Sequence, residues 1–245
     1  MKRGMNTLLL VIALFLVLPV RSAPVCGLES GCVRDLNLAM STAATASVGS
    51  GGRADLRPDA FEDQGLLPEV LELALRAFET AWKNGETRKK IITVIDYSLP
   101  SSEKRLWVID LDTNKLLFHE YVAHGSGSGG DSATRFSNRD GSHQSNVGLM
   151  KTAETYSGKH GYSLKLDGLE DGWNDNARDR SIVIHAADYV SEGFIRSHGR
   201  LGRSWGCPAL RPEISRSVID TIKGGSLVFG YYPDGEWLGG SSYLN

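Results

Sequence analysis

The sequence predicts a mainly β fold of the α+β class, with a few helices. Short runs rich in β-branched and apolar residues follow one another after residue 90, and turn-forming residues separate them. One amphipathic helix precedes these runs, and a second helical stretch lies between the last two. The 245 residues carry 41% hydrophobic and 23% charged side chains, as ordinary globular chains do, so we expect one main folded domain.

Residues 1–22 have the layout of a secretory signal peptide. Lys2 and Arg3 precede an apolar run at residues 8–18, and Ser22 provides the small side chain needed at a cleavage site. The apolar run is shorter than the roughly 20 residues that a membrane span requires. We therefore expect cleavage after Ser22, an exported protein in the periplasm or cell envelope, and no membrane span after signal removal.

Residues 23–60 are predicted to be an N-terminal segment and a flexible linker, rich in Ala, Ser, Thr and Gly. Cys26 and Cys32 are close enough in sequence to form a small disulfide loop in an oxidising compartment. A metal pair would need further ligands, which the neighbouring sequence does not show. If the two cysteines pair with each other, the third cysteine, Cys207, has no obvious partner.

Residues 61–90 are predicted to form an amphipathic helix that packs on the main domain. Pro68 near the start and Gly85 just past the end mark its limits. We expect its two aromatic side chains to lie in the core rather than to bind a ligand. Apolar residues recur there at helical spacing: Leu67, Val70, Leu71, Leu73, Ala74, Leu75, Phe78 and Trp82.

The main domain is predicted at residues 91–245. Its first three strands are expected at residues 91–97, 105–111 and 116–123. The short polar break at residues 112–114 is typical of a hairpin between antiparallel neighbours. The Gly/Ser-rich stretch at residues 124–142 is too long for a turn, and we expect it to form the rim of a site. Further strands are expected at residues 147–151, 181–186 and 226–232, with a helix at residues 213–223.

The charge and the motifs exclude several functions. With 27 Lys and Arg against 29 Asp and Glu, the formal net charge of −2 gives no electrostatic reason to expect a nucleic-acid or anionic-membrane partner. There is no Walker phosphate loop, no dinucleotide fingerprint and no cysteine pair at zinc-site spacing. No metal and no organic cofactor are predicted.

Cys207 is the predicted nucleophile, and His185 is the favoured base. An unpaired thiol in an exported protein favours chemistry over structure. An apolar, β-branched run at residues 181–184 ends at His185, which places the imidazole at a rigid strand end. Gly206 allows close backbone approach, and the N–H groups of Gly206 and Cys207 are candidate oxyanion donors.

Two alternatives stay open at this point. His198 is nearer to Cys207 in sequence and is the rival base, although it stands in a Gly-rich stretch without evident rigid support. An inert buried thiol and a core histidine are the structural alternative to a catalytic pair.

The chain resembles the L,D-transpeptidase catalytic domains, the YkuD-like enzymes of peptidoglycan, and most of all their divergent murein branch. The resemblance spans roughly residues 91–232. It rests on five ordered motifs: SSEKRLWVIDL at residues 101–111, VAHG at 122–125, GKHGYSL at 158–164, IVIHAA at 182–187 and SWGCPA at 204–209. The resemblance implies a β-sandwich or barrel catalytic domain.

By this resemblance, Cys207 attacks the third residue of a stem tetrapeptide, D-alanine leaves and a thioester forms, with His185 as the base. An amine then resolves the thioester, giving a 3-3 crosslink or an exchanged stem. The resemblance implies no metal and no cofactor. His124, Ser204, Arg203, Trp205 and His198 are the candidate substrate-binding residues.

The motif departs from the family pattern at two positions. Many members have a histidine where this chain has Trp205 and an arginine where it has Ala209. Arg203 and Arg211 are therefore candidates to hold a stem carboxylate. Two other functions are compatible with the sequence. One is an L,D-carboxypeptidase that passes the same thioester to water, and the other is a non-catalytic peptidoglycan-binding protein.

Overall fold

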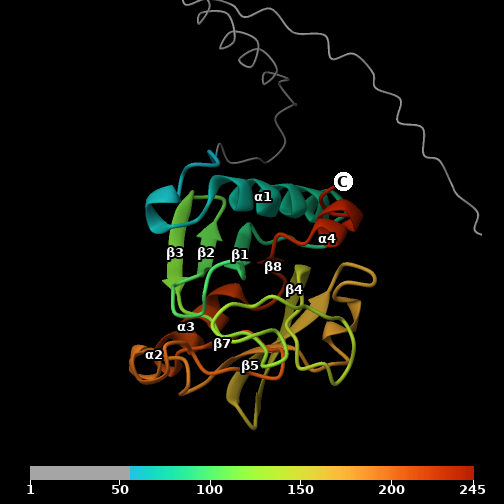
Figure 1. Ribbon diagram of the computed structural model, residues 1–245. Coiled ribbons are helices and arrows are strands. Elements are labelled where there is room, and N and C mark those ends of the chain that lie inside the picture. Colours follow the sequence, from blue (N-terminus) through green and yellow to red (C-terminus); the bar gives the residue numbers. More distant parts are fainter. Residues whose placement is uncertain (1–55) are drawn as a thin grey trace, which may run out of the picture. The chain divides into compact units, whose positions relative to one another are not determined.

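The computed structural model describes residues 56–245 (Figure 1). The predicted signal peptide, most of the predicted linker and the Cys26–Cys32 pair lie outside the described residues.

The core of the fold is a nearly closed, mixed β-sheet with eight strands in residues 56–245, in the order β3-β2-β1-β8-β4-β5-β6-β7. The pairs β1–β8 and β6–β7 are parallel, and the other neighbours are antiparallel. Backbone pairing of Ala123, just after β3, with Ala209 of β7 brings the two ends of the sheet together. The mainly β fold predicted from the sequence is confirmed. The strands are β1 (Ile91–Asp96), β2 (Leu106–Asp110), β3 (Lys115–Glu120), β4 (Gly148–Gly158), β5 (Gly161–Gly168), β6 (Val183–Ala186), β7 (Ala209–Leu210) and β8 (Leu227–Tyr231).

The hairpin predicted between the second and third strands is present. The Asp110 side chain accepts hydrogen bonds from the backbone N–H groups of Asp112 (2.8 Å) and Thr113 (3.2 Å). Asn114 completes the turn with φ of 56°, a left-handed conformation that asparagine tolerates better than most residues. Local turn chemistry therefore sets this connection, as the sequence indicated.

Helices cover both faces of the sheet. The alternation within β1 directs Ile92 and Val94 to one core cluster and Ile95 to the other. The first cluster includes the buried face of α1, which lies across one side of the sheet (Figure 1). The second includes the buried face of α3. The helices are α1 (Pro68–Lys83), α2 (Glu192–His198), α3 (Pro212–Ile222) and α4 (Gly235–Gly240), with 3₁₀ turns η1 (Glu62–Gln64) and η2 (Asp175–Ala177).

The sequence pattern did not predict β5, the outer half of β4, or β7. The outer half of β4 is mostly exposed and carries polar residues such as Thr155 and Ser157, so it shows no buried stripe. It is held as a strand by its ladder with β5. The two-residue β7 exists because it pairs with β6, with Ala209 opposite His185.

No helix within residues 56–245 has the length and apolar character needed to cross a membrane.

Candidate active site

Cys207 lies in the turn before β7, with its sulfur against the start of β6. Its side chain is a half-buried free thiol. The Val183 N–H points at Sγ from 3.5 Å, and the thiol faces the Ser181 carbonyl oxygen at 3.6 Å. The nucleophile predicted from the sequence is thus held beside the strand that carries His185.

The turn around Cys207 is built by Ser204 and Gly206. Ser204 Oγ donates to the Cys207 carbonyl (2.6 Å) and accepts the Gly206 N–H (3.1 Å). Gly206 has φ of 120°, and a Cβ there would stand 2.8 Å from the Gln144 carbonyl oxygen, so only glycine fits. The Gly206 N–H, predicted as an oxyanion donor, is engaged by Ser204 in this state.

The Gly/Ser-rich loop that follows β3 packs directly on the Cys207 turn. Ser145 Oγ connects the two, because it accepts the Gly125 N–H (3.0 Å) and donates to the Gly206 carbonyl (3.1 Å). The Ser126 N–H donates to the Ser204 carbonyl (2.8 Å). The loop that the sequence predicted as a rim therefore supports the backbone of the candidate nucleophile.

Replacing Gly125 by alanine is expected to disrupt the packing of the glycine loop on the Cys207 turn. The added Cβ would lie 2.3 Å from the His143 carbonyl oxygen and 2.8 Å from Gly206 Cα, both backbone atoms. We expect a loss of about 3 kcal/mol in the free energy of unfolding, at the upper end of overpacking costs. Urea unfolding measures it.

Gly130→Ala is the matched control in the same loop, since a Cβ at Gly130 meets nothing within 4 Å. Its effect is expected to stay within about 0.5 kcal/mol. Equal stability of the two variants would contradict the packing described for Gly125.

His185 lies on β6 with its ring buried. Its Nδ1 is 2.8 Å from the Ala186 carbonyl oxygen, so Nδ1 carries the proton of a neutral ring and Nε2 keeps the lone pair. Its backbone N–H donates to the Pro208 carbonyl (3.4 Å), next to Cys207. The ring of His160, from the β4–β5 turn, packs against it in a tilted arrangement, with centroids 4.4 Å apart and planes at 32°.

The surroundings keep both candidate catalytic groups neutral. Burial lowers the pKa of His185 from its usual 6.5, and the neighbouring His160 adds to this effect. Burial raises the pKa of the Cys207 thiol from its usual 9.0, while the Val183 N–H and the Arg180 charge act in the opposite direction. At neutral pH the pair is a thiol and a neutral imidazole, so a proton must leave the sulfur before it can attack.

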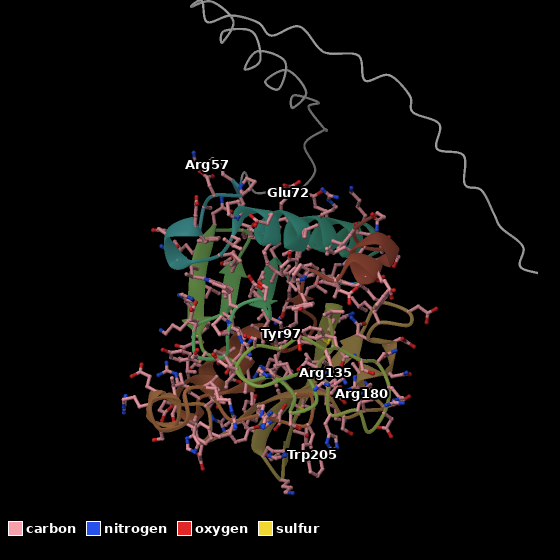
Figure 2. All side chains as sticks on the ribbon, viewed as in Figure 1. Arg57, Glu72, Tyr97, Arg135, Arg180 and Trp205 are labelled. Carbon is pink, nitrogen blue, oxygen red and sulfur yellow. The ribbon has the colours of Figure 1, made fainter. Side chains whose placement is uncertain are left out.

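Trp205 and Arg203 flank the turn. Trp205 is 74% exposed and stacks on His143, with ring centroids 4.8 Å apart and planes within 5°. It projects at the end of the molecule remote from α1 (Figure 2). Arg203 Nη1 donates to the Gly129 carbonyl (2.7 Å), which ties the turn to the glycine loop. Arg211 is paired with the carboxylate of Glu120 at 2.7 Å, so its charge is already neutralised.

His198 is not on a Gly-rich loop, so that expectation was wrong. It is the last residue of α2, which Ser191 caps by accepting the Phe194 N–H and which ends at Gly199 with φ of 70°. The exposed His198 ring stacks on Phe194 at 4.1 Å, and Nδ1 donates to the Phe194 carbonyl (3.1 Å). Its contacts are thus within its own helix.

His124 is fully buried. Its Nδ1 lies 2.7 Å from Nη2 of Arg105, which has only donors, so Nδ1 accepts and the ring is neutral. Burial, together with the Arg105 charge, lowers the pKa of His124 to about 4. Its carbonyl accepts the Ser204 N–H (3.0 Å), so the backbone of His124 supports the Cys207 turn.

Ser145 and Arg180 were not predicted from the sequence. Ser145 joins the two glycine segments described above, and the Arg180 charge acts on Cys207. The sequence signal for Arg180 is its place directly before the apolar run that ends at His185.

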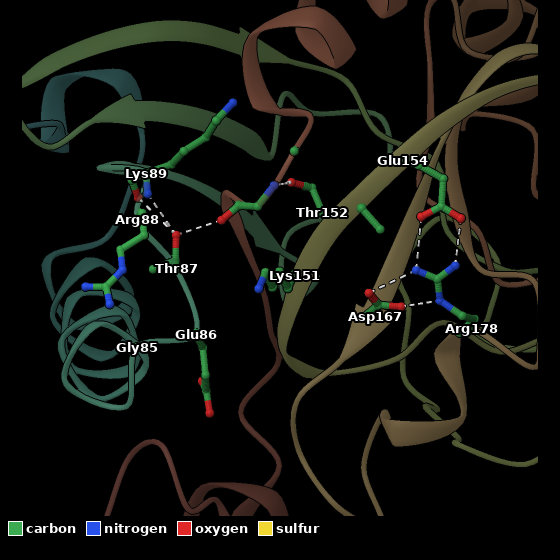
Figure 3. Close-up of a pocket in the computed structure, with 13 residues that line it drawn as sticks. Gly85, Glu86, Thr87, Arg88, Lys89, Lys151, Thr152, Glu154, Asp167 and Arg178 are labelled. Carbon is green, nitrogen blue, oxygen red and sulfur yellow. Dashed lines mark hydrogen bonds and ion pairs between the residues drawn. The ribbon is translucent and has the colours of Figure 1, made fainter.

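A separate open pocket lies where β4 and β5 face the segment between α1 and β1 (Figure 3). Its wall includes Arg178, which is held by Glu154 and Asp167. Neither Cys207 nor His185 lines it. Within residues 56–245, no cluster of three or more His, Cys, Asp or Glu side chains is placed to hold a metal ion.

Residues 62–231 match the family model of the L,D-transpeptidase catalytic domain. The match covers more than half of the chain, so the chain belongs to this family, which acts on peptidoglycan stem peptides. The resemblance inferred from the sequence motifs is confirmed.

Solved structures of similar proteins share little sequence with the chain. An L,D-transpeptidase from Mycobacterium smegmatis is 11% identical, with a TM-score of 0.37 over 58% of this chain and 59% of that one. The helical cell shape determining protein Pgp2 from Campylobacter jejuni is 12% identical, with a TM-score of 0.41 over 64% and 55%. An L,D-transpeptidase from Stackebrandtia nassauensis is 17% identical, with a TM-score of 0.36 over 72% and 76%. The matched region thus covers less than two thirds of the Mycobacterium smegmatis and Campylobacter jejuni proteins. No curated protein matches the chain.

Proposed function

We propose that the protein is a peptidoglycan L,D-transpeptidase that uses Cys207 as its nucleophile. The observation that carries the proposal is the half-buried free thiol of Cys207, held by a glycine turn against the strand that bears a neutral His185. In this proposal the catalytic domain comprises residues 91–245, and the preceding helix packs on it. The signal-like N-terminus supports action in the periplasm or cell envelope.

The proposed first half-reaction forms a thioester. His185 Nε2 takes the thiol proton, and the sulfur attacks the carbonyl carbon of the third residue of a stem tetrapeptide. The N–H of Cys207, joined by that of Gly206 if Ser204 releases it, stabilises the oxyanion. The tetrahedral intermediate collapses, the bond to D-alanine breaks, and His185 returns the proton to the leaving amine.

In the second half-reaction an amine of a neighbouring stem, or of a free D-amino acid, attacks the thioester carbonyl. His185 accepts a proton from this amine, and the sulfur leaves and recovers a proton. The product is a 3-3 crosslink or an exchanged stem. Attack by water instead would yield a tripeptide.

Trapping the thioester tests the proposal. Intact-protein mass spectrometry after acid quenching of a reaction with a tetrapeptide muropeptide is expected to show the enzyme carrying a tripeptide stem. The added mass should be removed by hydroxylamine, which cleaves thioesters. D-alanine release without an adduct on the peptide that contains Cys207, and equal turnover by Cys207→Ala, would contradict the mechanism.

The pH dependence of acylation is expected to follow the neutral pair. Protonation of His185 removes the base as the pH falls through its pKa, which lies below 6.5. The thiol keeps its proton up to its pKa, which lies above 9.0. We expect kcat/KM for the donor stem to be flat between about pH 6.5 and 9 and to fall in more acidic solution. Rates of D-alanine release across this range measure the pH dependence. A maximum of kcat/KM confined to pH values below about 6.5 would contradict the assignment of His185 as the base.

A further inference from the structure

Arg180 is a half-buried arginine whose hydrogen-bond partners are all neutral. It lies between η2 and β6, and both terminal nitrogens of its guanidinium are occupied. Among the described ion pairs, none includes Arg180, and Asp140 attracts it only at longer range. The acceptors are the carbonyl oxygens of Ser137 (2.5 Å) and Gln144 (2.6 Å), Asn146 Oδ1 (2.7 Å) and Ser142 Oγ (3.2 Å).

This cation is held next to the Cys207 turn. A Cβ on Gly206, the neighbour of Cys207, would lie 3.4 Å from Arg180 Nη2. The Arg180 charge acts to lower the pKa of the Cys207 thiol, against the larger effect of burial, which raises it. Figure 2 shows Arg180 in the same half of the molecule as Trp205. Trp205 is two positions before Cys207 in the sequence.

Burying a cation without an anion costs free energy, and burial lowers the pKa of Arg180 accordingly. Its four neutral acceptors fix the guanidinium but do not neutralise it. Since its terminal N–H groups are used, Arg180 is not free to grip a carboxylate with them. A fixed, uncompensated charge of this kind stabilises negative charge that appears beside it during a reaction.

We propose that Arg180 is a positioning residue whose fixed positive charge stabilises the Cys207 thiolate as the proton leaves the sulfur. This rests on the proposed function, in which that thiolate is the nucleophile. Arg180 acts through its charge and contacts neither the donor stem peptide nor the acceptor amine.

The other ionisable groups around the sulfur do not supply this charge. Tyr97 and Tyr189 lie within electrostatic range of Cys207, but burial raises the pKa of each to about 12, so they are neutral. His185 is neutral, because burial lowers its pKa. Arg203, on the same turn as Cys207, donates to the Gly129 carbonyl.

The test is the pKa of the Cys207 thiol, measured from the rate of iodoacetamide alkylation between pH 6 and 11. Mass spectrometry of the tryptic peptide at residues 204–216 reports on Cys207 separately from the other two cysteines. Arg180→Gln is expected to raise the thiol pKa by about one unit, a tenfold smaller thiolate fraction at neutral pH. Arg180→Lys keeps the charge, so its Cys207 thiol pKa should be close to that of the unmodified protein.

A second pair of variants leaves Arg180 in place. Ser142 Oγ lies 3.2 Å from Arg180 Nη2, so Ser142→Asp puts a carboxylate against the guanidinium, whereas Ser142→Asn has similar size and no charge. The aspartate variant is expected to raise the thiol pKa and the asparagine variant to leave it unchanged. This pair remains informative if Arg180→Gln does not fold.

An unchanged thiol pKa in folded Arg180→Gln, or in Ser142→Asp, overturns the proposal, and so does an equal shift in the aspartate and asparagine variants. The acyl-enzyme assay is separate from this measurement. A shifted thiol pKa without any acyl-enzyme would support the charge assignment and refute the transpeptidase function. Acyl-enzyme formation by the unmodified protein, with no shift of the thiol pKa in the variants, would support the transpeptidase function and refute the charge assignment.

Discussion

Replacing Cys207 by alanine is expected to lower the rate of D-alanine release from a tetrapeptide stem by about a thousandfold or more, because residues 56–245 contain no other cysteine to form the thioester. Folding should be little affected. The sulfur makes only two long polar contacts, at 3.5 and 3.6 Å, and the turn around it is held by backbone groups and Ser204. Chromatographic assay of free D-alanine measures the rate, and thermal unfolding checks the fold.

Cys207→Ser is the matched variant, since it keeps the shape and a hydroxyl in place of the thiol. It should also lose most activity, because the serine hydroxyl is a far weaker nucleophile without the activation that serine enzymes provide. More than a tenth of the original rate in folded Cys207→Ala would show that another residue carries the reaction.

Replacing His185 by glutamine is expected to lower kcat by about a hundredfold to ten-thousandfold, the usual contribution of a general base. The raised pKa of Cys207 makes the loss large, because the thiol does not ionise by itself near neutral pH. Single-turnover acylation measures the step directly. The activity lost should return partly at high pH, where hydroxide removes the thiol proton.

His198→Gln is the control and tests the rival base from the sequence analysis. Because the His198 ring is exposed and contacts Phe194 of its own helix, we expect activity within about twofold of the original, the size typical of a neutral surface change. A large loss in His198→Gln with little loss in His185→Gln would reverse the assignment.

The parts of the fold with strong local signals could be predicted from the sequence. The strand at Ile91–Asp96 is buried on both faces and rich in β-branched residues, and the turn that ends with Asn114 carries its own hydrogen bonds. The outer half of β4 and the two-residue β7 have no such signal. They are strands because of their partners β5 and β6, which a pattern along one segment does not reveal.

The same distinction applies to the candidate site. Cys207 and His185 stood out because each lies in a distinctive local context, a glycine turn and the end of an apolar strand. Arg180 did not, because its environment comes from a loop 36 positions away at Gln144 and an arginine beside a strand is usually a solvated charge. His198 was misplaced, since the capping signals at Ser191 and Gly199 were not recognised.

The central claim is acyl transfer from Cys207 to an amine, and product analysis tests it most directly. Tetrapeptide muropeptides are incubated with the protein and a D-amino acid, beside Cys207→Ala, and the products are identified by mass spectrometry. We predict 3-3 crosslinked dimers or stems that carry the added D-amino acid, both absent with the variant. Tripeptide as the sole product, or unchanged substrate with both proteins, would contradict the claim.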